Sequence, residues 1–212
     1  YGMPILLIRH GEAVSNVAPE VGSWHDPPLT QNGRQQATAL AQRLQKTIGS
    51  NCKLYTSHRK RARETAGIIA QHINVEPIIE TELDEYRHGL EPTTTMEEST
   101  TYWTDKCNPI RGWRPYSCGE SVEEIFKRAG EVIEKIDAEC DGWSLVVSHS
   151  WLIDKIISYW TGVRIDTLQP FVFSTTNTGA TVLTYRHGDR IIKHMNDTLH
   201  LGESFETILN SK

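Results

Sequence analysis

The chain of 212 residues is 38% hydrophobic and 23% charged, a composition typical of globular proteins that bury a substantial core. Its formal net charge of -5 gives no overall attraction for nucleic acid or an anionic membrane, so an anion must be bound by a local cluster of cations. The chain has no apolar run long enough to cross a bilayer, and its N-terminus lacks the pattern of a secretory signal. We therefore expect a cytoplasmic protein with no nucleic-acid or membrane partner.

Hydrophobic periodicity predicts alternating strands and helices from Met3 onward, and Tyr1 and Gly2 are left outside the fold. In chain order we predict a strand at 4–8, a helix at 31–48, a strand at 53–56, a helix at 59–73, a strand at 76–80, a helix at 122–139, a strand at 143–148, a helix from there to 160, and a hairpin of strands at 178–186 and 190–195. Thr30 is expected to cap the first helix, and Ser121 with Glu124 forms a capping box for the third.

This alternation predicts an α/β fold: a three-layer α/β/α sandwich whose central sheet is mostly parallel, with an antiparallel strand at its end. We expect a single domain over residues 3–212. Residues 87–118 depart from the pattern because they are rich in Thr, Pro, Gly and aromatic residues. This segment is predicted to be a loop-rich insertion that covers the active site at the carboxyl edge of the sheet. The four cysteines lack CxxC spacing and are expected to be free thiols.

Polar clusters follow three of the predicted strands, and the carboxyl ends of parallel strands meet at one edge of a sheet. The clusters are Arg9, His10, Glu12 and Asn16; Arg59, Lys60, Arg61 and Arg63; and Ser148, His149 and Ser150. A lone histidine or a basic run more often has a structural role, so the functional prediction depends on their convergence.

The basic cluster lies at the start of a predicted helix, where each cation opposes the positive end of the helix dipole by roughly 0.3 to 1 kcal/mol. This arrangement indicates a bound anion, and the helix beginning near Ser150 offers its free N–H groups to the same anion. Two histidines and at least two arginines in one crevice suit phosphoryl transfer. One neutral imidazole attacks phosphorus, and the other groups stabilise the charge on the phosphoryl oxygens.

The leaving oxygen in such a reaction needs a proton donor. The sequence LDE after the third strand offers Glu85 or Asp84 at the same edge of the sheet. Burial beside the phosphate is expected to raise the pKa of this carboxyl enough for it to donate a proton near neutrality.

Taken in order, these motifs resemble the histidine phosphatase superfamily, whose fold is phosphoglycerate mutase-like. The resemblance rests on LIRHGE, DPPLTQNGRQQA, SHRKRARETA, LDE, GES, VVSHS and NDTLHL, which together span nearly the whole chain. It implies that His10 is the phosphorylated nucleophile and that Glu85 is the proton donor. The phosphate pocket that it implies consists of Arg9, Asn16, Arg61 and His149. The resemblance also implies that the enzyme uses no metal and no organic cofactor.

Arg61 is chosen over its basic neighbours because it precedes Ala62 in the family pattern RAxxTA. Two features depart from the family. Ser150 stands where the family usually has glycine; its backbone N–H remains available to substrate, and its hydroxyl narrows the pocket or adds a hydrogen bond. The segment after Glu85 lacks both the GxWEG run of small-molecule phosphatases and the paired arginines of mutase insertions.

The leading hypothesis is a phosphatase that hydrolyses a phosphomonoester of a small metabolite through phospho-His10 and releases inorganic phosphate. The alternative is a phosphoglycerate mutase, because the loop VGSWHDPPLT keeps a mutase-like spacing from Asn16. An inactive binding module is a third hypothesis, and it is disfavoured because every expected pocket position is filled. The sequence is compatible with an oligomer.

The predicted insertion combines aromatic faces with cations at Trp103, Arg111, Trp113, Arg114 and Tyr116. Two interpretations remain open for this set. The side chains hold a ring or a second anionic group of the substrate by stacking and cation–π contact, or they pack the insertion onto the domain.

Overall fold

The structure, a computed structural model, describes residues 3–139, 141–168 and 172–202. Within these ranges a sheet of six strands runs in the order β3-β2-β4-β1-β5-β6. The strands are β1 (Ile5–Arg9), β2 (Cys52–Thr56), β3 (Pro77–Ile79), β4 (Trp143–Ser148), β5 (Ala180–Arg186) and β6 (Asp189–Asp197). The pairs β1–β4, β4–β2 and β2–β3 are parallel, whereas β5 is antiparallel to both β1 and β6. The predicted sheet is confirmed, with its antiparallel strand.

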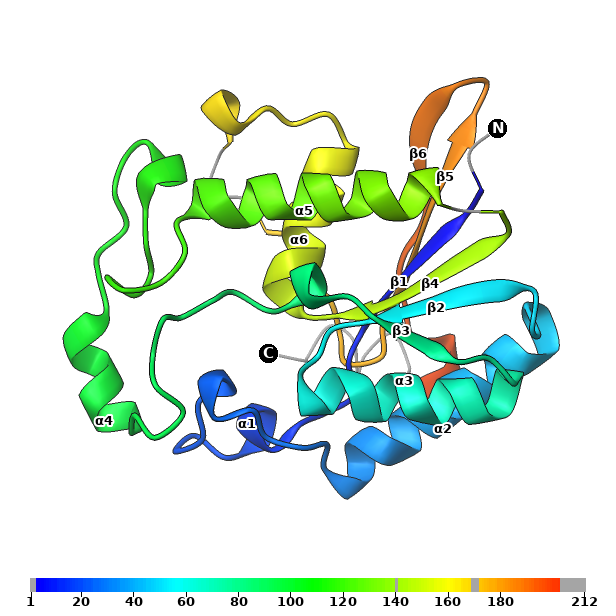
Figure 1. Cartoon of the computed structure of the whole chain (residues 1–212), viewed down its shortest axis with the longest axis horizontal. Helices are drawn as coiled ribbons and strands as arrows, with labels where there is room; N and C mark the ends of the chain where they lie inside the picture. Colours follow the sequence, from blue (N-terminus) through cyan, green and yellow to red (C-terminus); the bar gives the residue numbers. More distant parts are fainter. Residues whose placement is uncertain (1–2, 140, 169–171, 203–212) are drawn as a thin grey trace.

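Four long helices cover the two faces of this sheet, which confirms the three-layer architecture (Figure 1). They are α2 (Gln31–Thr47), α3 (Lys60–Ile73), α5 (Val122–Ala138) and α6 (Ser150–Trp160). Shorter pieces are α1 (Val14–Val17), α4 (Met96–Ser99) and 3-10 turns at Ser23–His25, Thr81–Leu83, Thr100–Tyr102, Ile110–Gly112, Ile165–Thr167 and Leu199–Leu201. Thr30 caps α2 by accepting from the N–H of Gly33, and Ser121 with Glu124 forms the predicted capping box of α5.

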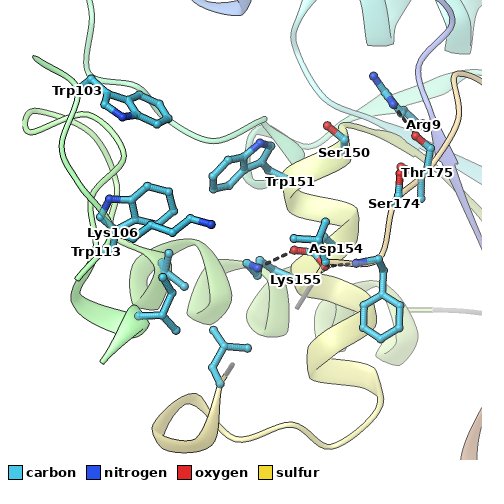
Figure 2. Close-up of a pocket in the computed structure, with 15 residues that line it drawn as sticks. Arg9, Trp103, Lys106, Trp113, Ser150, Trp151, Asp154, Lys155, Ser174 and Thr175 are labelled. Atoms are coloured by element: carbon cyan, nitrogen blue, oxygen red, sulfur yellow. Dashed lines mark hydrogen bonds and ion pairs between the residues drawn. The ribbon is translucent and has the colours of Figure 1, made fainter. Parts of the chain in front are cut away.

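Residues 87–118 contain α4 and two of the 3-10 turns, and they lie beyond the carboxyl ends of β1 and β4 (Figure 1). An isolated bridge joins Trp103 to Tyr116 within the segment. The carbonyl oxygen of Thr94 accepts a hydrogen bond of 2.8 Å from the indole of Trp24, which ties the segment to the chain after β1. Trp103 and Trp113 face α6 across a hollow (Figure 2).

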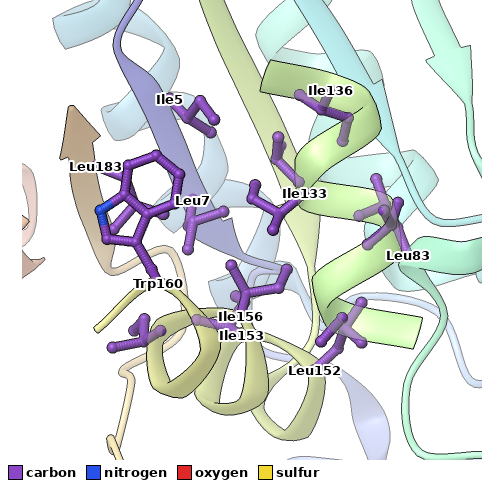
Figure 3. Close-up of a cluster of buried hydrophobic side chains, with 14 of the residues drawn as sticks. Ile5, Leu7, Leu83, Ile133, Ile136, Leu152, Ile153, Ile156, Trp160 and Leu183 are labelled. Atoms are coloured by element: carbon purple, nitrogen blue, oxygen red, sulfur yellow. The ribbon is translucent and has the colours of Figure 1, made fainter. Parts of the chain in front are cut away.

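Each face of β1 contributes to a different half of the core, because successive side chains of a strand point to opposite faces. Ile5 and Leu7 pack with α5 and α6 (Figure 3). Leu6 and Ile8 pack with α2 and α3. The first strand is therefore buried on both faces, and it forms a rigid support for the residues that follow it in the chain.

Three of the four cysteines lie in the described ranges, and Cys52, Cys107 and Cys118 are free, as expected. Cys140 lies outside the described residues. So do Tyr1, Gly2 and the part of the predicted domain after Gly202.

Candidate active site

His10 directly follows β1 and is 3% exposed. Its Nδ1 lies 2.7 Å from the carbonyl oxygen of Gly11. Because a carbonyl can only accept, the hydrogen bonds assign the ring proton to Nδ1 and leave a lone pair on Nε2. Burial and the positive charges of Arg61 and Arg9 hold the pKa of His10 well below its usual value. The imidazole is therefore neutral, with Nε2 as its nucleophilic atom.

The chain after His10 is held by a close approach to the start of α2. Thr30 donates to a carboxylate oxygen of Glu12 at 2.6 Å, and Asn32 donates to the other oxygen at 3.1 Å. A Cβ on Gly33 would lie 2.0 Å from the carbonyl oxygen of Glu12, so only glycine fits there. The Glu12 carboxylate is thus occupied by hydrogen bonds to α2 and its cap, and these bonds fix the loop that carries His10.

Two arginines from distant parts of the chain lie beside His10. Arg61, in the first turn of α3, is 1% exposed and donates from Nε to His10 Nε2 at 3.1 Å. Arg9 donates from Nη1 to the carbonyl oxygen of Thr175 at 2.5 Å. Burial lowers the pKa of both guanidiniums, but from a value so high that both stay charged. Buried Arg61 and half-buried Arg9 act on one carboxylate, that of Glu85, so an excess of positive charge is left for an anion.

His149 occupies the N-cap position between β4 and α6. Its Nε2 lies 2.9 Å from the hydroxyl of Ser57, and that hydroxyl oxygen accepts from the N–H of Arg59 at 3.3 Å. The hydroxyl hydrogen is free to point at Nε2, and with that orientation the ring proton lies on Nδ1. Burial, followed by the charge of Arg61, holds the pKa of His149 well below its usual value. A neutral second imidazole lies 5.1 Å from that of His10, centroid to centroid.

Unpartnered polar atoms gather around these groups. In the described ranges, the buried side-chain atoms without a hydrogen-bond partner include Arg9 Nε, His149 Nδ1 and Thr175 Oγ1. Native structures rarely bury such atoms without a partner. Their clustering beside His10 indicates a polar ligand, and three hydrogen-bond donors suit an oxyanion.

Glu85 lies at the same edge, after β3, and is 8% exposed. One carboxylate oxygen accepts from the N–H groups of Tyr86 and Trp151, both at 3.1 Å, and the other is 3.5 Å from the hydroxyl of Ser150. Burial raises the pKa of Glu85, although Arg61 and the backbone donors oppose the shift. Asp84, the alternative proton donor, is instead bound by Arg59 through two hydrogen bonds of 2.8 and 3.2 Å.

Of the predicted basic cluster, only Arg61 reaches His10. Arg59 pairs with Asp84, and Lys60 and Arg63 are exposed. The structure thus brings one cation of this cluster, Arg61, to His10. The side chains of neighbouring residues at a helix start point in different directions, and only one of them points at the carboxyl end of β1.

Asn16 is linked to His10 by Asn177, a residue that the sequence did not single out. Its Oδ1 accepts from the N–H of Ala13 at 2.9 Å and from the amide of Asn177 at 3.3 Å. Asn177 also donates to the carbonyl oxygen of His10 at 3.0 Å. The Nδ2 of Asn16 has no partner in the part of the chain that the structure describes, so it is free to donate to a ligand.

Asn196 supports this arrangement from the end of β6. Its Oδ1 accepts from the N–H of Thr176 at 2.8 Å, and its Nδ2 donates to the hydroxyl of the same residue at 3.0 Å. The clamp holds the turn that presents the Thr175 carbonyl to Arg9 and the Asn177 amide to His10. Asn196 belongs to the NDTLHL motif, which was noted in the sequence without a role.

Arg128 was not predicted, although it holds the Glu85 loop. Its guanidinium donates to the carbonyl oxygens of Glu82 and Asp84 at 2.8 Å and of Glu85 at 3.1 Å, and it pairs with Glu120. It is 5% exposed on the apolar face of α5. A charged residue on a face otherwise buried was the signal that could have identified it.

A hollow of about 530 Å³ adjoins Arg9 and Ser150 between α6, residues 103–113 and residues 172–175 (Figure 2). We call it the side pocket. Trp103 and Trp113 line it, but Arg111 and Arg114 do not. Arg114 pairs with Glu124 at 2.8 Å and borders a different surface hollow, so its predicted role in holding substrate is not supported. Tyr116 packs against Trp24, Tyr86 and His88.

The described residues contain no group of three or more His, Cys, Asp or Glu side chains arranged to hold a metal ion. Nor does any helix in the described ranges have the length and apolar character needed to span a membrane.

Comparisons with known proteins agree on one family. Residues 5–198 match the sequence model of the histidine phosphatase superfamily (branch 1). Phosphoserine phosphatase 1 of Hydrogenobacter thermophilus is 27% identical over 210 residues, 95% of each chain. A probable phosphoglycerate mutase of Serratia proteamaculans is 31% identical over 168 residues, 76% of each. A structure of Entamoeba histolytica phosphoserine phosphatase with 3-phosphoglyceric acid aligns with a TM-score of 0.73 at 26% identity, covering 94% of this chain and 99% of the other.

Proposed function

Because the chain belongs to the histidine phosphatase superfamily, we propose that it hydrolyses a phosphomonoester of a small metabolite through a phosphohistidine on His10 and releases inorganic phosphate. The observation that carries the proposal is the tautomer of His10. Its Nδ1–H is engaged by the carbonyl of Gly11, so the lone pair of Nε2 faces the buried guanidinium of Arg61. A neutral nucleophile between two arginines is suited to attack a bound phosphate.

In the first step the phosphate binds among Arg9, Arg61, Asn16 and His149. Arg61 then exchanges its hydrogen bond to Nε2 for one to a phosphoryl oxygen, which frees the lone pair. His149 donates its Nδ1–H, and Arg9 its unpartnered Nε–H, to the other oxygens. These donors are in place before the reaction, so they stabilise the charge that builds on the phosphoryl group without reorganising.

In the second step the lone pair of His10 Nε2 forms the N–P bond as the P–O ester bond breaks. The leaving oxygen takes a proton from Glu85, whose raised pKa favours the protonated form. Water then attacks phosphorus and gives its proton to the Glu85 carboxylate, and the N–P bond breaks to return neutral His10 and release phosphate. The hydroxyl of Ser150, near the freer oxygen of Glu85, is proposed to orient that carboxyl or to contact the substrate.

A mutase remains the second candidate, since a 31% identical relative is named a probable phosphoglycerate mutase. In that reaction phospho-His10 returns its phosphoryl group to a bound acceptor instead of to water. The relatives' names make phosphoserine and 3-phosphoglycerate the first compounds to assay. An inactive binding module is opposed by the intact set of nucleophile, arginines and buried carboxyl.

Purified protein assayed with a panel of phosphorylated metabolites and one phosphopeptide tests the proposal. Inorganic phosphate release without interconversion of 3- and 2-phosphoglycerate is the expected result. Interconversion without net phosphate release would overturn it in favour of the mutase. Tight binding of vanadate or phosphate without turnover of any compound would leave only the binding module.

A further inference from the structure

The side pocket has walls suited to an apolar body. Trp103 and Trp113 lie 6.2 Å apart between ring centroids, and Trp151 on α6 lies 6.4 Å from Trp113. Its remaining apolar lining includes Ile110, Val122 and Leu168. A hollow of about 530 Å³ with such walls falls in the size range of pockets that enclose ring-bearing ligands.

A buried ammonium group faces this apolar surface. Lys155 is 6% exposed, and its Nζ lies 2.6 Å from a carboxylate oxygen of Asp154. The other oxygen of Asp154 accepts from the N–H of Phe173 at 2.8 Å. An ammonium group has three N–H donors, and in the described ranges only one of those on Lys155 has a partner. Because Lys155 lines the side pocket, the remaining two donors are available to a ligand with acceptor atoms.

A second ammonium approaches from the opposite wall. Lys106 Nζ lies 5.4 Å from the ring centroid of Trp113. In Figure 2 the ends of Lys106 and Lys155 extend toward one another across the pocket. Asp154 neutralises one of these two cations, and in the proposed function Arg9 binds the phosphate. One positive charge at this end of the pocket is therefore not balanced by a carboxylate. The ammonium groups of Lys106 and Lys155 also repel each other unless an anion lies between them.

We propose that the side pocket selects a phosphomonoester whose organic part is a ring-sized apolar group carrying a second anionic group, a carboxylate or a phosphate, which Lys155 and Lys106 bind. This inference rests on the proposed function, because the phosphate of the same molecule must occupy the site beside His10. Ser150 and Lys155 are five residues apart on α6, a rise of about 7.5 Å along the helix axis. A second anion held across an aromatic ring is therefore expected to suit this separation better than the carboxylate of phosphoserine, which lies only one oxygen and two carbons from phosphorus.

The test compares two aryl phosphates that differ only in the group opposite the ester, 4-carboxyphenyl phosphate and 4-methylphenyl phosphate. We expect kcat/KM to be about tenfold higher for the carboxylate in the unmodified protein, the size of one charge-assisted contact. The ratio should fall to about one or two in Lys106→Met and in the double variant Asp154→Asn with Lys155→Met. The double variant avoids leaving the Asp154 carboxylate buried without its cation.

Lys127→Met is the matched control, because this exposed lysine lies on α5 outside the side pocket. Its ratio should equal that of the unmodified protein. A ratio near one in the unmodified protein, or a tenfold ratio that survives in both pocket variants, would overturn the proposal.

Binding of the corresponding benzylphosphonates, with and without the carboxylate, separates this proposal from the proposed function. Calorimetry needs no turnover. A protein that hydrolyses neither ester but binds the carboxylated phosphonate about tenfold more tightly refutes the phosphatase and supports the pocket. Equal binding of both phosphonates, together with hydrolysis of both esters at equal rates, refutes the pocket and leaves the phosphatase intact.

Discussion

The corner around His10 and the side pocket next to it lie at the same edge of the sheet, yet different kinds of support hold them. The corner is built from strand ends and helix starts, and His10, Arg61, Glu85 and His149 are each less than a tenth exposed. Both histidines have a ring nitrogen fixed by a hydrogen bond. The far wall of the side pocket comes instead from residues 103–113, where Trp103 is 53% exposed.

The difference teaches where each property of the enzyme is encoded. Reaction chemistry requires atoms held within a fraction of an ångström, and only packed elements provide such support. Substrate choice tolerates more variation, because a loop can change its side chains without disturbing the core. Variants of the corner should therefore affect turnover of every substrate, and variants of the side pocket should affect the ranking of substrates.

The largest effect is expected from His10→Ala. Loss of the nucleophile should lower kcat by about 10⁴-fold or more on every phosphoester and should abolish the acid-labile phosphoenzyme. Rapid-quench labelling with a ³²P substrate measures both. His194→Ala, which removes an exposed histidine on β6, is the control and should keep full activity. A phosphoenzyme that persists in His10→Ala would assign the nucleophile to another residue.

Glu85→Gln should have the next largest effect, and one that depends on the leaving group. We expect kcat to fall by about 10² to 10³ for alkyl phosphates, whose leaving oxygen needs a proton. The loss should be much smaller for 4-nitrophenyl phosphate, whose leaving group is stable without one. Glu97→Gln in α4 serves as the surface control. An equal loss on both kinds of substrate would argue that Glu85 has a structural role.

The pH dependence sharpens the same assignment. His10 must be neutral, and its lowered pKa means that kcat/KM falls only when the pH drops through a value below the usual range of histidine. Glu85 must be protonated, so kcat/KM falls again as the pH rises through its raised pKa. We expect a bell-shaped profile with its maximum on the acid side of neutrality. In Glu85→Gln, an alkaline limb unchanged from that of the unmodified protein would exclude Glu85 as its source.

Asn196→Ala tests whether the hydrogen bonds that hold the turn behind the active site affect catalysis, as the active-site residues themselves do. Without the clamp on Thr176, Arg9 and Asn177 lose their fixed partners, and kcat/KM should fall about tenfold on all substrates alike. Asn196→Asp keeps the acceptor and tolerates the positive φ of 48°, so it should recover part of the loss. A lower free energy of unfolding with unchanged kcat/KM would limit Asn196 to a folding role.

The smallest effect is expected from Arg114→Ala. Its exposed pair with Glu124 should contribute at most about 1 kcal/mol to the free energy of unfolding, which denaturant titration measures. We expect kcat/KM to change by less than about twofold on both aryl phosphates. A selective rise in KM for the carboxylated substrate would show that Arg114 contacts substrate in the side pocket. It would contradict the conclusion that Arg114 lies on a different surface.

Much of the fold followed from local patterns. The apolar runs at β1 and β4 and the caps at Thr30 and Ser121 are properties of a few consecutive residues, which is why their positions were predicted within one or two residues. The parallel orientation of most strands was predicted because helices separate these strands in the sequence. His10 and His149 were found because each follows directly on a strand, and Arg61 because it lies at the start of a helix. The roles of Asn16 and Glu85 came from the family resemblance.

Ser57 and Asn177, which sequence reasoning missed, share a different property. Ser57 meets His149, and Asn177 meets His10, across 92 and 167 residues of chain. Such pairs leave no periodic signal, and a serine or an asparagine is common in any loop. The direction of side chains in residues 87–118 was equally hidden, because a loop has no repeat that assigns them to a face. The sequence therefore drew attention to Arg114, while the structure places Lys106 in the side pocket.

The sequence by itself determined the α/β layers, the family and the neighbourhood of His10, because these depend on runs of residues and on the shared edge of parallel strands. Only the tertiary structure decided which nitrogen of His10 carries the proton, which carboxyl remains available after Asp84 pairs with Arg59, and which cations face the side pocket. Those properties depend on distances of a few ångströms between residues far apart in the chain, and such distances exist only after folding.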